Sequence, residues 1–432
     1  MKESVYRKLY KRFKQSNGVS TDTRTINQGE VFFALKGPNF NANDFARDAI
    51  SKGAALAVVD SPETDLSQNE DYIVVDDSLK ALQWLASEFR KEFDIPLIGL
   101  TGSNGKTTTK ELINAVLSRA FKSYATPGNL NNHIGVPLSI LSMPKDTEIA
   151  VIEMGANHIG EIDLLCRIAQ PTHGLITNVG KDHLEGFGSF EGSLRANSEL
   201  YQYLIEHGGV AFINSSDTIL NNMARRFERP VLYPGKSDYS YTEYIGSDPF
   251  IKYRAESGAE VKTQLIGKYN FNNIATALCL GKYFSVPEIK ANEAVTGYQP
   301  KNNRSEWKKT GKNLVLLDAY NANPSSMEVA LESFLEMEGN RKAVILGDMF
   351  ELGQYSDTEH RDLGKKLAGS EISKIILCGK AMSKAADQIS NAEYFETKKE
   401  LLEYLQNNSL KDYLILIKAS RGMALEDCLP YL

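Results

Sequence analysis

The chain of 432 residues is poor in cysteine, has no long apolar run and carries no excess of positive charge. Its four cysteines lie far apart, with neither a CxxC pair nor a histidine cluster at zinc-ligand spacing. This distribution argues against a disulfide scaffold or a zinc module and favours free thiols in a reducing compartment. Because no apolar stretch approaches the ~20 residues that span a bilayer, we expect no membrane insertion. The polar, basic start of the chain lacks the apolar core of a signal peptide, which predicts a cytoplasmic protein.

Charge is nearly balanced, with 49 lysine and arginine residues against 55 aspartate and glutamate residues and a net charge of −6. A mildly acidic chain argues against a general nucleic-acid coat, because non-specific phosphate binding requires a positive field. A small anionic ligand is compatible with this charge, since it needs only local cations and hydrogen-bond donors.

The length predicts two or three domains, and the pattern of the sequence changes twice along the chain. Residues 1–93 combine an amphipathic opening helix with short strand-like runs and end in a second helix. Residues 94–300 repeat buried strand, polar loop and helix, except for an alternating, antiparallel-looking stretch near 239–265. Residues 301–432 alternate regularly between strands and helices. We expect an α/β protein of three domains: a small mixed N-terminal domain, a central mostly parallel sheet and a C-terminal Rossmann-like, doubly wound domain.

The strongest motif is a glycine-bearing turn between a buried strand and a helix, in the segment 97–110, LIGLTGSNGKTTTK. Gly102 and Gly105 can adopt backbone angles closed to other residues, so that successive N–H groups converge on phosphate oxygens. Lys106 adds a point charge near the β- and γ-phosphates, and the Thr107 hydroxyl can bind Mg²⁺. The motif departs from the usual pattern at Leu100, where a glycine is normal. It predicts a central domain of the P-loop ATPase type, with ATP bound by Thr101, Gly102, Ser103, Asn104, Gly105, Lys106, Thr107 and Thr108.

The loop TGSNGKTT resembles the phosphate loop of the Mur ligase family, and the resemblance extends over nearly the whole chain. It includes STDTR at 20–24, GEVFFAL at 29–35, GNLNNHIGVPL at 128–138, EMGA at 153–156, ITNVGKDH at 176–183, DAYNANP at 318–324, GDMFELG at 347–353 and KASR at 418–421. The motifs at 318–324 and 347–353 discriminate best within the family. They resemble the member that uses D-alanyl-D-alanine, whereas sister ligases carry a histidine in the first of these loops.

The resemblance implies an ATP-dependent amide ligase of peptidoglycan precursor synthesis, which joins D-alanyl-D-alanine to a UDP-N-acetylmuramoyl-tripeptide. Phosphoryl transfer from ATP to the substrate carboxylate would give an acyl phosphate, which the amine would attack, and ADP and phosphate would be released. The domains 1–93, 94–300 and 301–432 would bind the UDP-sugar, ATP with Mg²⁺, and the dipeptide. The implied partners are these small molecules, with no nucleic acid, and the expected state is a monomer. Whether the third peptide residue is diaminopimelate or lysine stays open.

By this resemblance the catalytic residues are Lys106, Glu153 and His183. Thr107 and Glu153 are expected to hold one Mg²⁺ ion, because Glu153 ends a buried strand, where an unpaired carboxylate is costly. His183 would share a second Mg²⁺ with Glu153. The alternatives are an ion pair between Glu153 and Lys106, and a hydrogen-bonded turn position for His183.

One departure from the family concerns Asn197, which stands where most members carry a lysine that becomes carbamylated and supports the second metal. An amide cannot be carbamylated, so we expect no dependence on bicarbonate. Either Glu153, His183, phosphate and water hold the second metal, or another acid substitutes, with Glu199 the nearest candidate.

The remaining candidates are assigned by resemblance. Asn270 and Asn273 match a motif near the adenine, although asparagine also caps helices, and Arg304 and Asp318 would complete the nucleotide site. Substrate-binding candidates in the first two domains are Thr21, Asp22, Thr23, Arg24, Asn129, Asn131 and Asn132. Those in the third domain are Asn321, Asn323, Lys418, Ser420 and Arg421, where an arginine fork suits a carboxylate.

Three other functions fit parts of the sequence. A P-loop kinase or NTPase would explain residues 101–108 but leaves 318–324 and 347–353 without a role. A sister ligase would use another amine. A non-catalytic nucleotide-binding protein is disfavoured by the intact Lys106, Thr107, Glu153 and His183.

Overall fold

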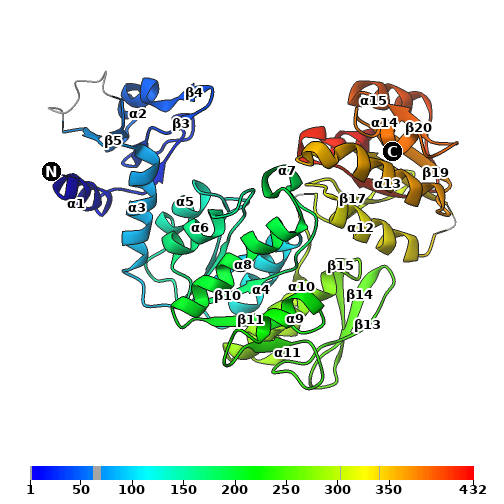
Figure 1. The fold of residues 1–432 in the computed structure, drawn as a ribbon, viewed down its shortest axis with the longest axis horizontal. Coiled ribbons are helices and arrows are strands. Elements are labelled where there is room, and N and C mark those ends of the chain that lie inside the picture. The colour runs from blue at the N-terminus through cyan, green and yellow to red at the C-terminus, as the bar shows by residue number, and fades with distance from the viewer. Residues whose placement is uncertain (1, 62–69, 302, 340) are drawn as a thin grey trace.

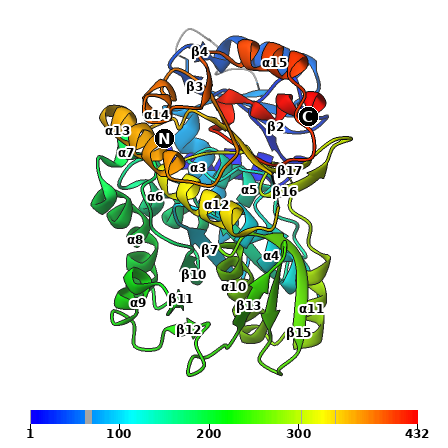
Figure 2. The same ribbon diagram turned by 90° about the vertical axis from the view of Figure 1, so that its right-hand side faces the viewer.

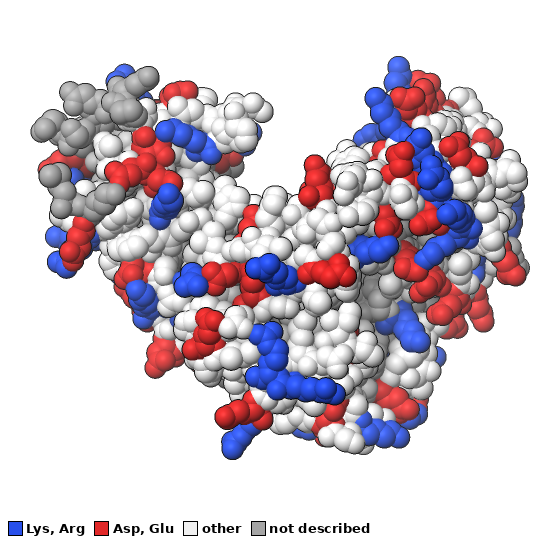
Figure 3. All heavy atoms as spheres, viewed as in Figure 1, with Lys and Arg blue, Asp and Glu red and all other residues white. Residues whose placement is uncertain are grey.

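The computed structural model describes residues 2–61, 70–301, 303–339 and 341–432. Three parts follow one another along the chain, each built around its own main sheet, and they form a broad V with the central part at its base (Figure 1). The α/β fold class expected from the sequence is confirmed. The space between the two arms of the V is visible as a deep hollow on the molecular surface (Figure 3).

The N-terminal part is a parallel sheet in the order β1-β2-β5-β6. Its strands are β1 (Val19–Ser20), β2 (Val31–Phe33), β5 (Leu56–Val59) and β6 (Tyr72–Val74), and β3 (Lys36–Gly37) pairs with β4 (Phe40–Asn41) in a small hairpin. Its helices are α1 (Lys2–Phe13), α2 (Ala46–Ser51) and α3 (Ser78–Arg90). The last helix begins at the Asp77 cap and buries Leu82, Leu85 and Phe89 in a core that continues into the central part. This shared core anchors the N-terminal arm.

The central part is a parallel sheet in the order β12-β11-β10-β7-β9-β8. Its strands are β7 (Leu97–Thr101), β8 (Ser123–Ala125), β9 (Ile149–Glu153), β10 (His173–Ile176), β11 (Val210–Asn214) and β12 (Val231–Tyr233). The helices before the antiparallel sheet are α4 (Lys106–Leu117), α5 (Gly135–Leu141), α6 (Glu161–Ala169), α7 (Leu184–Phe187), α8 (Phe190–Glu206) and α9 (Thr218–Ala224). Apolar strand residues such as Ile98 and Ile152 are fully buried, because helices cover both faces of the sheet.

The stretch that was expected to be antiparallel forms a separate sheet of β13 (Glu243–Ser247), β14 (Phe250–Arg254) and β15 (Glu260–Ile266). It leads into α10 (Asn270–Tyr283) and α11 (Glu288–Gly297). Both helices share a buried core with α4 and one face of the central sheet.

The C-terminal part is a six-stranded sheet in the order β16-β17-β21-β18-β19-β20, parallel except for β16. Its strands are β16 (Glu306–Lys309), β17 (Leu314–Asp318), β18 (Lys342–Gly347), β19 (Lys374–Cys378), β20 (Glu393–Phe395) and β21 (Leu414–Lys418). Its helices are α12 (Pro324–Glu336), α13 (Ser356–Ala368), α14 (Ser383–Ala386) and α15 (Lys398–Asn407). In the view of Figure 2, α12 and α13 lie toward the viewer, with the central sheet below them. In open α/β sheets ligands bind at the carboxyl ends of the strands, which here bear the predicted site residues.

Candidate active site

The phosphate loop lies between β7 and α4, as predicted, and its shape is fixed by the neighbouring strand β10. Gly102 has a φ of +134°, and a Cβ atom there would lie 2.1 Å from Thr177 Oγ1. Thr177 Oγ1 donates to the Asn104 carbonyl (2.7 Å), and Asn178 Oδ1 accepts from the Asn104 N–H (3.1 Å). The glycine is therefore required both by the backbone angle and by the close packing of the loop.

Lys106 begins α4 and folds back over this loop. Its Nζ donates to the carbonyl oxygens of Gly102 and Ser103, the latter at 3.4 Å. Burial lowers the pKa of the Lys106 ammonium, while the carboxylates of Asp182 and Glu153 act in the opposite direction. The Lys106 ammonium lies close to the N-terminus of α4. A lysine and a helix N-terminus together favour the binding of a phosphate group.

Glu153 ends β9 beside the loop and is only 1% exposed. Its Oε1 accepts from Thr107 Oγ1 (3.1 Å) and from Asn131 Nδ2 (2.9 Å). Its ion pair is with Lys110, 2% exposed, whose Nζ lies 3.4 Å from Glu153 Oε2. The ion pair of Glu153 with Lys106, considered above as an alternative, is therefore replaced by one with Lys110. Lys110 was not identified from the sequence. Its position three residues after Thr107, on the same side of a helix, was the available signal.

Thr107 and Glu153 fit a divalent cation. Glu153 Oε2 is buried without a hydrogen-bond partner in the part of the chain that the structure describes, and hard carboxylate and hydroxyl oxygens are what Mg²⁺ selects. Among the described residues, no three histidine, cysteine, aspartate or glutamate side chains form a metal cluster. A site with few protein ligands suits Mg²⁺, which commonly binds one or two protein oxygens and takes its other ligands from phosphate and water.

His183 lies in the turn between β10 and α7, in a left-handed conformation with a φ of +43°. It lines the same cavity as Glu153. Its Nδ1 contacts the Glu351 carboxylate of the C-terminal part. The turn position weighed above as the alternative for His183 is present. Its side chain also contacts Glu351 from another part of the molecule, a partner that the sequence did not reveal.

Asn197 is buried behind the phosphate loop on α8. Its Oδ1 accepts from Thr101 Oγ1 (2.9 Å) and its Nδ2 donates to the Ser193 carbonyl (2.9 Å). Glu199 is not available as the substitute acid considered above, because its two oxygens accept from the backbone N–H groups of Gly160 (2.7 Å) and Asp163 (3.0 Å) at the start of α6. Glu199 therefore caps a helix.

We expect activity to be the same in carbon-dioxide-depleted buffer as in buffer with added bicarbonate. The Asn197 amide cannot be carbamylated, and its hydrogen bonds join the phosphate loop to α8 instead. Initial rates measured at both conditions test this. A rate that rises severalfold with bicarbonate would show that another amine of the chain is carbamylated.

A cavity of about 620 Å³ lies between the central and C-terminal parts. Such a volume is in the range of small-molecule sites. It is lined by most of the predicted site residues: Ser103, Asn104, Gly105, Lys106, Thr107, Thr108, Asn129, Asn131, Asn132, Glu153, His183, Asn270, Asn273, Arg304, Asp318, Asn321, Asn323 and Lys418. Residues separated by more than 300 positions in the sequence thus meet in one space.

Asn270 and Asn273 connect α10 to α4 at the floor of this cavity. Asn270 Nδ2 donates to the Ile266 carbonyl (2.7 Å), its Oδ1 accepts from Asn273 Nδ2 (2.8 Å), and Asn273 Oδ1 accepts from Thr109 Oγ1 (2.9 Å). The alternative of simple N-capping does not apply, because α10 begins after Tyr269 without a side-chain cap. Gly105, with a φ of +79°, lies so close that a Cβ atom would be 2.9 Å from Asn273 Oδ1.

The C-terminal part contributes the ends of β17 and β21 and the loop that follows β17. Lys418 Nζ pairs with Asp318 Oδ2 (2.5 Å) and donates to the Asn321 carbonyl (3.1 Å). Asn323 caps α12 and donates from Nδ2 to Asn104 Oδ1 (3.0 Å) of the phosphate loop. The Arg304 guanidinium stacks over the Tyr320 ring at 3.5 Å.

Three groups of predicted residues do not line this cavity, and the first is Thr101 and Gly102 at the start of the phosphate loop. Ser420 is buried and accepts from the Phe350 N–H (2.8 Å), and Arg421 pairs on the surface with Glu426 (2.6 Å). Thr21, Asp22, Thr23 and Arg24 belong to the N-terminal arm, which contributes no residue to the lining of the cavity. There the exposed Arg24 guanidinium lowers the pKa of Asp22 to about 2. The role of these residues in binding substrate stays a prediction.

The four cysteines are all buried and unpaired, as expected. None of the described helices is long and apolar enough to cross a membrane.

Comparison with known proteins identifies a family over most of the chain. Three family models match in succession: the Mur ligase family catalytic domain over residues 15–90, the Mur ligase middle domain over 100–281, and the Mur ligase glutamate ligase domain over 303–421. The UDP-N-acetylmuramoyl-tripeptide–D-alanyl-D-alanine ligase of Bacillus subtilis (strain 168) is 37% identical over 421 residues, which cover 95% of this chain and 92% of that protein.

Solved structures are similar over nearly the whole chain. A crystal structure of MurF from Acinetobacter baumannii has a TM-score of 0.88 at 30% identity and covers 98% of this chain and 97% of its own. MurF ligase from Thermotoga maritima in complex with ADP has a TM-score of 0.83 at 26% identity and covers 96% of this chain and 97% of its own. The chain therefore belongs to the Mur ligase family.

Proposed function

We propose that the chain is an ATP-dependent ligase that joins D-alanyl-D-alanine to UDP-N-acetylmuramoyl-tripeptide, a step of peptidoglycan precursor synthesis. The observation that carries this proposal is the cavity in which the phosphate loop and Glu153 face Asp318, Asn321 and Lys418. A nucleoside triphosphate and a second substrate can meet in this cavity. The relatives from Bacillus subtilis and Escherichia coli, similar over most of the chain, are named as ligases of this specificity.

The first step is transfer of the γ-phosphoryl group of ATP to the tripeptide carboxylate. Two anions must approach each other, so the site has to neutralise charge before the bond can form. Lys106 and the backbone N–H groups of Gly102 to Thr108 bind the β- and γ-phosphates. Thr107 and Glu153 would hold Mg²⁺, which would withdraw charge from the phosphate oxygens.

The second step is attack of the dipeptide amine on the acyl phosphate, which expels phosphate. Asn321 and Lys418 would orient the dipeptide. The pairing of Lys418 with Asp318 fixes the Lys418 side chain at the end of β21. Asn129, Asn131 and Asn132 lie on the other wall and contact the tripeptide. Arg304 and Asp318 close the nucleotide site from the C-terminal side, and Asn270 and Asn273 lie toward the adenine.

The three parts divide these tasks. Residues 1–93 bind the UDP group through Thr21–Arg24, residues 94–300 bind ATP and Mg²⁺, and residues 301–432 bind the dipeptide. We further propose that the protein acts as a monomer in the cytoplasm, where its nucleotide substrates are made. Ser420 and Arg421 do not line the cavity and stay proposed contacts of the tripeptide or of the dipeptide carboxylate.

A coupled ADP-release assay over a matrix of nucleotide acceptors and amines tests the proposal. We expect ADP release only when UDP-N-acetylmuramoyl-tripeptide and D-alanyl-D-alanine are both present. Turnover with ATP alone would support a P-loop NTPase, and turnover with a different amino acid would identify a sister ligase. A panel with diaminopimelate or lysine as third residue also decides the acceptor.

A further inference from the structure

We propose that Glu351, in the C-terminal loop 347–353, is a positioning residue that orients His183 for metal binding, so that docking of the C-terminal part completes the metal site of the central part. This inference rests on the proposed function. It gives a role to the motif GDMFELG, none of whose residues lines the cavity of about 620 Å³ that contains Glu153.

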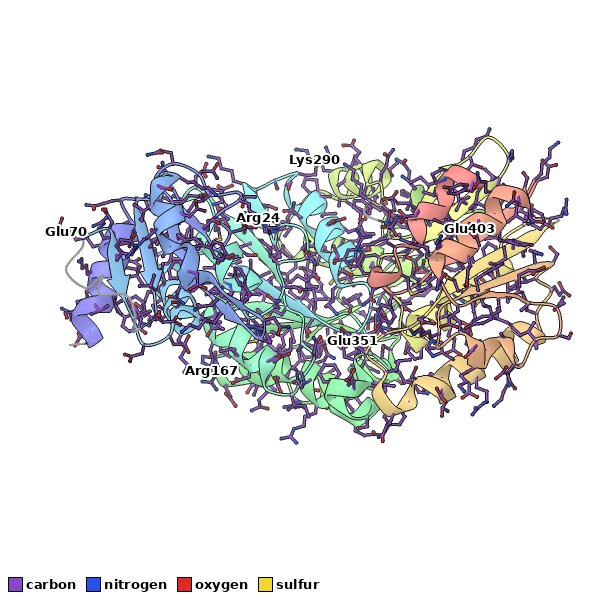
Figure 4. The ribbon with its side chains drawn as sticks, turned by 90° about the horizontal axis from the view of Figure 1, so that it is seen from above. Arg24, Glu70, Arg167, Lys290, Glu351 and Glu403 are labelled. Atoms are coloured by element: carbon purple, nitrogen blue, oxygen red, sulfur yellow. The ribbon has the colours of Figure 1, made fainter. Side chains whose placement is uncertain are left out.

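The contact between Glu351 and His183 joins two parts of the chain. His183 follows β10 of the central part, Glu351 follows β18 of the C-terminal part, and Glu351 Oε2 pairs with His183 Nδ1. Figure 4 places Glu351 where the green central ribbon meets the yellow and orange C-terminal ribbon. The contact with His183 lowers the pKa of the Glu351 carboxyl below the ordinary glutamate value.

Both residues are held in unusual backbone conformations. His183 has a φ of +43° and Glu351 a φ of +61°, left-handed angles that cost free energy for residues with a side chain. Such angles persist only where the surroundings determine them. Here they bring the two side chains together across the boundary between the parts.

The loop that carries Glu351 is docked on α7 by several contacts. The Glu351 carbonyl accepts from the Glu185 N–H (3.1 Å), Gly353 packs on the Glu185 side chain, and the Tyr355 hydroxyl donates to the Gly188 carbonyl (3.0 Å). These contacts fix the loop on the helix that His183 itself begins.

A carboxylate on Nδ1 has a defined consequence for the imidazole. It holds the proton on Nδ1 and leaves Nε2 as the nitrogen that can bind a metal, and it fixes the plane of the ring. His183 lines the cavity that also contains Glu153, so this orientation directs the histidine to the metal shared with that carboxylate. When the C-terminal part is undocked, His183 lacks this partner, and the site holds the metal less tightly. Metal binding and closure over the dipeptide are thereby coupled.

The test is the affinity of the protein for Mn²⁺, measured by calorimetry or electron paramagnetic resonance in the presence of a non-hydrolysable ATP analogue. Loss of such an outer-shell partner typically weakens metal binding by about 10- to 100-fold. We expect Glu351→Ala to fall in this range and Glu351→Gln, which keeps an acceptor oxygen, to retain part of the affinity. Glu403→Gln, an exposed glutamate paired with Lys399 on α15, is the matched control and should leave the affinity unchanged.

Two outcomes would overturn the inference. One is an unchanged or tighter Mn²⁺ affinity in a folded Glu351→Ala variant, which would make the ion pair a contact of docking alone. The other is an equal loss in Tyr355→Phe, which removes a docking contact but leaves the Glu351 carboxylate in place. Because the wild-type protein is assayed for ligation in parallel, failure of the proposed function would appear as an inactive wild type and is distinguishable.

Discussion

The Lys106→Ala variant is expected to lose ligase activity by about 10²- to 10³-fold or more, the size of effect seen when one donor that stabilises developing charge is removed. Among the described residues, Lys106 is the only cationic side chain that donates to backbone carbonyls of the loop, those of Gly102 and Ser103. Without it, the charge that builds between the γ-phosphate and the carboxylate loses its nearest counter-charge. The rate of D-alanyl-D-alanine-dependent ADP release measures the effect.

Lys122→Ala is the matched control, because Lys122 lies in the same part of the chain but pairs with Asp146 on the surface. It should keep full activity and the same melting temperature. If Lys106→Ala retained more than a tenth of the wild-type rate, the loop would not be the phosphate site.

The Glu153→Gln variant is expected to lose both activity and stability. Activity falls by about 10²-fold or more because the carboxylate that binds Mg²⁺ becomes a neutral amide. The free energy of unfolding falls by about 3–5 kcal/mol, since Lys110 would keep a buried charge without its partner. Activity assays and chemical denaturation measure the two losses separately.

A double variant separates these two effects. Glu153→Gln combined with Lys110→Met removes the unpaired cation, so most of the lost stability should return while activity does not. A double variant that regained activity would show that Glu153 serves only to neutralise Lys110. One that regained no stability would show that the 3.4 Å contact is not an important ion pair.

The features that depend on nearby residues were predictable from the sequence. The phosphate loop, α4 and the central strands were found because a buried apolar run, two glycines and a helix follow one another within fourteen residues. The edge strands β8, β12, β16 and β20 were missed, since three or four residues carry too little pattern.

Features that depend on the tertiary arrangement were not predictable. The sequence identified Glu153 and His183 as separate motif residues, but Lys110 and Glu351 became visible as their partners only in the folded chain. Asn270 and Asn273 were assigned to the nucleotide region by their motif, and this role stays a prediction. That they bind Thr109 rather than cap a helix depends on how α10 packs on α4.

The most direct test of the proposed chemistry follows the carboxylate oxygen. The reaction is run with UDP-N-acetylmuramoyl-tripeptide labelled with ¹⁸O in the acceptor carboxylate, and the released phosphate is analysed by mass spectrometry. Because the carboxylate oxygen attacks the γ-phosphorus and leaves with phosphate when the amine attacks, we expect one ¹⁸O atom in each phosphate. Unlabelled phosphate would contradict the acyl-phosphate route, because it would mean that water, and not the carboxylate, had taken the phosphoryl group.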